Sequence, residues 1–129
     1  MSDNRDVGAR SPKDWKTSSH HGAGEWLAER GTSLVLIPLT LWAAWAACQI
    51  AGGGYDAALA FARVPLNAGI IAFTVLISAW HMYMGLKVII DDYIGKPSTR
   101  GLLLFLSFFL SAAAFVATAG ALWLVHQAA

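Results

Sequence analysis

The hydrophobic and polar positions of this chain alternate on a long scale, with three apolar stretches separated by short polar turns. Charged residues are missing from the 25 positions between Arg30 and Asp56, the 23 between Arg63 and Lys87, and the 29 that follow Arg100. A helix that crosses a bilayer needs roughly 17–25 mostly apolar residues. The pattern therefore predicts three membrane-spanning helices.

We place the three spans at about residues 31–51, 65–90 and 101–125. Their connections are short, so neighbouring helices must run antiparallel, and the predicted fold class is all-α, a three-helix up-down-up bundle. Residues 1–24 are polar without an apolar period and are interpreted as a flexible N-terminal tail. Residues 25–129 then form a membrane anchor domain.

Basic residues in short loops indicate which side of the membrane each loop faces. The second loop carries Lys96 and Arg100, while the first loop has only Arg63; the tail and its junction with the first span add five more basic residues, Arg5, Arg10, Lys13, Lys16 and Arg30. The N-terminus and the second loop should therefore face the cytoplasm, and the first loop and the C-terminus should face outward.

Composition narrows the function classes. The chain is 57% hydrophobic and 13% charged, whereas a soluble domain is about 45–50% apolar and about 25% charged. A soluble enzyme with its own catalytic domain is excluded. The single cysteine, Cys48, allows neither an intrachain disulfide framework nor a CxxC-type zinc site, and a net charge of +1 gives no reason to expect a nucleic-acid partner.

His81 is the residue that most needs an explanation, because an ionisable side chain inside an apolar span is costly and is by default a functional hypothesis. It precedes Asp91 by ten residues, which places it roughly 15 Å from the membrane boundary. A neutral imidazole at that depth needs either an interhelical hydrogen bond or a metal. Gly85, one turn further on, leaves room on the same face for a flat ligand such as haem. A six-coordinate haem would take its second axial ligand from another subunit.

The second span ends in Asp91, Asp92 and Tyr93. Two carboxylates at a helix C-terminus oppose the helix dipole, so the doublet is unusual. In one interpretation Tyr93 donates a hydrogen bond to a polar ligand head and Asp92 orients it; in the other this is a solvated helix end with an interfacial tyrosine. Arg30 is similarly either a snorkelling anchor or a cation that pairs with an anionic group such as a haem propionate.

Two segments combine these residues into a recognisable order, HGAGEWLAERGTSLVLIPLTLW at 21–42 and HMYMGLKVIIDDYIGKP at 81–97. The order resembles that of succinate dehydrogenase hydrophobic membrane anchor subunits, the D-type small subunits of respiratory complex II. That family has a G-x-x-x-W/F-x-x-x-R lead into the first span, an H-x-x-x-G in the second, and a D-Y pair eleven and twelve residues after the histidine. Asp92 and Tyr93 stand at those distances from His81, and the resemblance covers about residues 21–126.

The resemblance implies a role for each of these residues. His81 is similar to the axial ligand of the haem b iron, and Arg30 to the arginine near the haem propionates. Tyr93 matches the tyrosine that hydrogen-bonds the carbonyl of ubiquinone, the substrate, and Asp92 matches its neighbour. Asp91 adds a carboxylate that departs from the family's pattern.

The resemblance also implies the setting. The chain would be the membrane anchor subunit of succinate:ubiquinone oxidoreductase, in which electrons from succinate oxidation pass to quinone, and it would catalyse nothing alone. Its partners would be the cytochrome b556 (C-type) membrane subunit that supplies the second haem histidine, the iron–sulfur subunit, the flavoprotein subunit and membrane lipid. It would be a multi-pass protein of the bacterial inner membrane.

A different class of function is a small structural membrane scaffold or a transport accessory subunit without haem. His81 would then only hydrogen-bond between helices. Small residues in the third span, among them Ser107, Ser111 and Gly120, would let another helix approach closely in either case.

Overall fold

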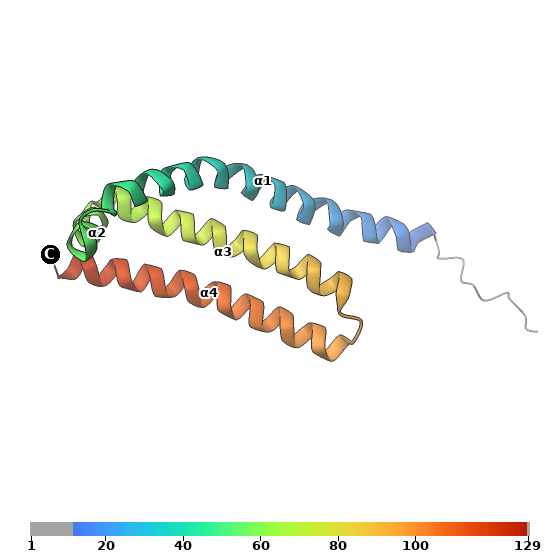
Figure 1. Cartoon of the computed structure of the whole chain (residues 1–129). Coiled ribbons are helices and arrows are strands. Elements are labelled where there is room, and N and C mark those ends of the chain that lie inside the picture. The colour runs from blue at the N-terminus through green and yellow to red at the C-terminus, as the bar shows by residue number, and fades with distance from the viewer. Residues whose placement is uncertain (1–11, 129) are drawn as a thin grey trace, which may run out of the picture.

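The computed structural model describes residues 12–128 and contains four helices: α1 (Pro12–Ile50), α2 (Gly54–Arg63), α3 (Pro65–Tyr93) and α4 (Pro97–Gln127) (Figure 1). The segment Gly22–Ile50 of α1 and the whole of α3 and α4 are long and apolar enough to cross a membrane. The described chain has no strand. The predicted all-α architecture with three spans is confirmed.

The three long helices run up, down and up, and α3 lies in the middle. In Figure 1 the start of α1 is at the same end as the turn between α3 and α4, whereas α2 and the C-terminus are at the opposite end. We call these the Tyr93 end and the α2 end. Within the described part of the chain, α1 and α4 both pack against α3 and make no close backbone approach to each other. The side chains of α3 therefore determine how the bundle is held together.

The first helix is longer than the predicted span. It begins at Pro12, inside the stretch that the sequence analysis assigns to the tail, and continues to Ile50. Residues 1–11 of that tail lie outside the described residues, and the division into a tail and an anchor domain stays a prediction. Pro38 lies inside α1 without ending it, and α1 is visibly bowed in Figure 1.

The connection between the first two spans contains a short helix, α2, where the sequence analysis expects only a loop. The chain turns at Gly54, whose φ of +61° is accessible mainly to glycine. The ring of Phe61 then lies 5.9 Å from that of Trp42 and 6.2 Å from that of Trp45, both on α1. These aromatic contacts pack α2 against α1 and leave its residues 57–59, 61 and 62 half-buried.

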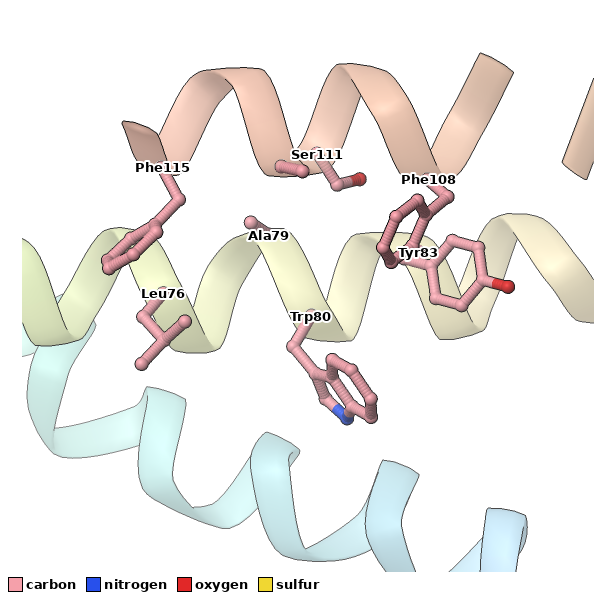
Figure 2. A pocket seen from close by; sticks show the side chains of 8 residues that line it. Leu76, Ala79, Trp80, Tyr83, Phe108, Ser111 and Phe115 are labelled. Atoms are coloured by element: carbon pink, nitrogen blue, oxygen red, sulfur yellow. The ribbon is translucent and has the colours of Figure 1, made fainter. Parts of the chain in front are cut away.

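Small residues make up most of the buried positions between the helices. Five residues of the described chain are buried: Ala46, Ala68, Ala79, Ile90 and Ser111. Ser111 on α4 donates a hydrogen bond to the carbonyl of Ser107 at 2.8 Å, so its hydroxyl is satisfied within its own helix. Figure 2 shows Ser111 close to Ala79 of α3. With little driving force from water, close packing of small residues is what associates helices in lipid.

This contact yields a stability prediction. Replacing Ala79 by Leu should push α4 away from α3 and destabilise the bundle by about 1–3 kcal/mol, the usual cost of overpacking. The matched control is Ala113→Leu, because Ala113 is exposed on α4. Unfolding of the full chain in detergent micelles measures both. Equal stability of the two variants would contradict the small-residue contact.

Candidate functional site

His81 of α3 and Thr32 of α1 meet between the two helices. The Nδ1 atom of His81 lies 2.9 Å from the Oγ1 atom of Thr32. Thr32 stands 18 residues before the end of α1 and His81 stands 16 residues after the start of α3, so the antiparallel arrangement brings them to one level. An imidazole inside an apolar span was expected to need a partner, and His81 has one in Thr32. The interhelical hydrogen bond engages Nδ1, one of the two ring nitrogens.

The hydroxyl of Thr32 is itself fixed to the backbone of α1. It donates to the carbonyl of Ala28 at 2.9 Å and to that of Glu29 at 3.0 Å. The remaining nitrogen of His81, Nε2, makes no hydrogen bond within the described residues. One side of the imidazole is therefore anchored and the other is available to a ligand.

His81 stands on a face of α3 that we call the His81 face, formed by Ser78, His81, Gly85 and Asp92, which meets α1 at His81. Each residue turns the helix by about 100°, so these four positions fall within roughly 60° around the axis of α3. Ala79, which contacts α4, lies about 160° around the same axis from His81. A Cβ added at Gly85 would meet no atom within 4 Å. The described chain thus leaves room next to His81 for a planar group or a partner helix.

Asp92 and Tyr93 lie at the Tyr93 end of α3, away from His81. Both are exposed, and 82% of Tyr93 is accessible. Eleven residues separate Asp92 from His81, which corresponds to roughly 16–17 Å along the helix on nearly the same face. The structure therefore aligns Asp92 with His81 without contact, and it places Tyr93 where α3 ends.

Arg30 lies on the opposite side of α1 from the histidine. Because it precedes Thr32 by two residues, it points about 160° away from the direction of the Thr32 hydroxyl. Its guanidinium lies 5.3 Å from the ring centroid of Trp26, within the range of a cation–π contact. Within the described chain, Arg30 is stacked on Trp26 and is not brought against His81.

An ion pair between Lys87 and Glu25, which the sequence analysis does not predict, joins α3 to α1 on the Tyr93 side of His81. Their side chains are 31% and 63% accessible, and a pair this exposed to water is typically worth at most about 1 kcal/mol. The signal in the sequence was a lone basic residue in α3 and an acidic residue at the same level of α1. The pair is a second contact, next to Thr32–His81, between the same two helices.

Arg100 holds the turn between α3 and α4. Its Nε and Nη2 atoms donate to the carbonyl of Ile94 at 3.2 and 3.1 Å, and its Nε lies 3.8 Å from Oδ1 of Asp91. The guanidinium thus satisfies a carbonyl at the end of α3 and faces one carboxylate of the acidic doublet. This contact gives Asp91 a structural partner and leaves Asp92 on the His81 face.

An apolar cavity between α3 and α4 contains none of the predicted site residues. It has a volume of about 180 Å³, and Figure 2 shows Trp80 and Tyr83 of α3 and Phe108 and Phe115 of α4 around it. The ring of Tyr83 meets that of Phe108 edge-on at 5.7 Å. Apolar cavities are common ligand sites, but His81 lies on another side of α3. The residues that the sequence predicts as a site therefore lie outside this cavity.

Comparison with known proteins agrees with the motif analysis. The profile of the succinate dehydrogenase/fumarate reductase transmembrane subunit family matches residues 5–118. The chain is 31% identical over 88 residues to a succinate dehydrogenase hydrophobic membrane anchor subunit of Rickettsia typhi, covering 68% of this chain and 70% of the relative. It is 28% identical over 98 residues to the protein of that name from Rickettsia prowazekii, covering 76% and 75%. No solved structure matches the chain.

The turn generates a prediction of its own. Replacing Arg100 by Ala should cost about 1–2 kcal/mol of local stability, since charge-assisted hydrogen bonds to the Ile94 carbonyl are lost. Backbone amides of residues 94–96 should exchange with deuterium roughly 5–30 times faster. Arg63→Ala, at an exposed position at the α2 end, is the control. Unchanged exchange at the turn in Arg100→Ala would show that the guanidinium does not hold it.

Proposed function

This chain belongs to the succinate dehydrogenase/fumarate reductase transmembrane subunit family, and on that premise we propose that it supplies one axial ligand to haem b and part of the ubiquinone-reduction site. It is a multi-pass membrane anchor subunit, a role that implies association with the other subunits of the complex. The proposed partners are the cytochrome b556 subunit, the iron–sulfur subunit and the flavoprotein subunit. The proposed location is the bacterial inner membrane, in keeping with the bacterial relatives.

The observation that carries the haem proposal is the state of His81. One ring nitrogen is engaged by Thr32, the other is uncommitted within the described chain, and Gly85 leaves space beside the ring. The described residues contain no cluster of three or more metal-binding side chains, but an axial haem site needs only one histidine from each of two subunits. The residues present therefore fit the group. When bound, haem would accept and release single electrons at this level of the membrane.

The quinone proposal rests on the last turn of α3. In this proposal the hydroxyl of Tyr93, which is exposed at the end of α3, donates a hydrogen bond to a carbonyl oxygen of ubiquinone, and Asp92 precedes it in the chain. A donor aimed at an oxygen that gains negative charge during reduction stabilises that charge. Arg30, at its Trp26-stacked position, would serve the haem propionates only after its side chain turns.

The location of these residues suits the reaction. Ubiquinone is apolar and enters from the bilayer, whereas succinate is a water-soluble dicarboxylate, so electrons must reach the quinone at a membrane surface. The excess of basic residues near the Tyr93 end favours the cytoplasm for that surface. In the proposed arrangement the soluble subunits dock there, and the α2 end faces outward.

A haem-free scaffold is the alternative, and the Thr32–His81 hydrogen bond is compatible with it because it satisfies the imidazole on one side without a metal. Replacing His81 by Ala distinguishes a haem-binding subunit from a haem-free scaffold. We expect the reduced b-type band of the purified complex to be lost, while the variant complex still contains the anchor.

The control for that substitution is His126→Ala, at an exposed position near the C-terminal end of α4, which should leave the spectrum unchanged. A His81→Ala complex whose haem spectrum and potential equal those of the unmodified complex would contradict ligation by His81.

Tyr93→Phe tests the quinone site. Removal of the hydroxyl should lower ubiquinone reduction roughly tenfold or more, because a donor that stabilises developing charge is lost. Succinate oxidation with a soluble artificial acceptor should be unchanged. Tyr55→Phe, at a tyrosine that is 77% exposed at the α2 end, should change neither rate. An equal loss in both assays of Tyr93→Phe would indicate faulty assembly and not quinone binding.

A further inference from the structure

We propose that Thr32 is a positioning residue for the haem ligand: its hydroxyl accepts a hydrogen bond from Nδ1–H of His81, which fixes the ring and leaves the lone pair on Nε2 for the iron. The inference rests on the proposed function, because it assigns a purpose to the orientation of a ligand that the proposed function names. The supporting observation is a set of three contacts made by the Oγ1 atom of Thr32.

The direction of the hydrogen bond follows from counting protons. The Oγ1 atom of Thr32 has three neighbours at 2.9–3.0 Å, namely Nδ1 of His81 and the carbonyl oxygens of Ala28 and Glu29. A carbonyl oxygen can only accept, and a hydroxyl has one proton. If that proton pointed to His81, both oxygen–oxygen contacts would bring lone pairs together with no proton between them. All three contacts are favourable only if the two carbonyls share the hydroxyl proton of Thr32 and Nδ1 of His81 carries a proton that it donates to Oγ1.

The position of the second nitrogen follows from the first. In an imidazole ring, Nε2 lies on the far side from Nδ1, and Nδ1 points at Thr32 of α1. The Nε2 lone pair therefore points away from the Thr32 hydroxyl. The α4 contact at Ala79 lies about 160° around α3 from His81, so the histidine does not stand on the α4 side of the helix. Gly85, one turn further on, offers no side chain next to the ring.

This arrangement has two consequences for a bound haem. Histidines that ligate metals almost always donate their other ring N–H to an acceptor, which fixes the tautomer and the plane of the ring and makes the ligating nitrogen more basic. A more basic ligand favours the ferric over the ferrous state, so the hydrogen bond should lower the haem potential. Because Oγ1 is tied to two carbonyls of α1, the acceptor cannot turn away when the haem changes its charge.

The tautomer can be measured without haem. We would label the histidines of the full chain with ¹⁵N, purify it in detergent, and identify the His81 signals by their loss in His81→Gln. The proposal expects a protonated Nδ1 and an unprotonated Nε2. A proton on Nε2 in the unmodified chain would overturn the proposal whatever the behaviour of any variant.

The assembled complex supplies the second test. Thr32→Val keeps the shape of the side chain but removes the acceptor, so we expect haem affinity to fall by about 10–100-fold, the usual effect of losing such a partner, and the haem potential to rise. Thr32→Ser retains the hydroxyl and should restore both. Thr40→Val, at an exposed position of the same helix, is the matched control and should change neither.

The outcomes separate this inference from the proposed function. If His81→Ala removes the haem signal while Thr32→Val leaves affinity and potential unchanged, His81 is the ligand and Thr32 does not position it. If neither substitution affects the haem, the ligand assignment itself is wrong. A rise in potential that Thr32→Ser reverses supports Thr32 as the positioning residue.

Discussion

The structure depends on how an imidazole is accommodated inside an apolar helix. A polar group within the bilayer core must find a partner there, because water is not available to it. His81 finds Thr32 on the neighbouring helix at 2.9 Å, and Thr32 is held in turn by the backbone of α1. The contact sets the level of α1 against α3, and the exposed Lys87–Glu25 pair reinforces that register nearer the Tyr93 end. Because imidazole has two nitrogens, an interhelical hydrogen bond and iron ligation are complementary and not exclusive.

The arrangement of the helices explains why a small subunit can contribute to a larger site. With α3 between α1 and α4, both outer helices pack against α3, and α1 reaches the His81 face through Thr32. Open space remains on that face at Gly85, where an added Cβ would meet no atom within 4 Å. Few side chains are buried within the described chain, and large apolar residues are exposed along all three long helices. In lipid this exposure has no cost, and small residues allow close approach by further helices. Such a chain is suited to assembly with further helices.

The sequence was informative where a simple period or charge rule applies. Three uncharged stretches predicted the three long helices, and the depth of His81 followed from counting residues. Contacts between helices were harder to predict from the sequence, because they depend on how antiparallel helices are rotated about their axes. No motif in the sequence distinguishes Thr32, and Arg100 was counted only as a basic loop residue; the fold places them beside His81 and Ile94. The short helix α2 was expected to be a loop, and its packing through Phe61 against two tryptophans of α1 is a contact between distant segments that the sequence does not show. The roles of Asp92, Tyr93 and Arg30 remain predictions, as each depends on groups outside this chain.

The central claim is that Nε2 of His81 binds the haem iron, and magnetic resonance of the ferric complex tests it most directly. With all histidines of the complex labelled with ¹⁵N, hyperfine spectroscopy counts the imidazole nitrogens bound to iron. The account predicts two such nitrogens in the unmodified complex and only one after His81→Met. Two iron-bound imidazole nitrogens in the His81→Met complex would contradict it.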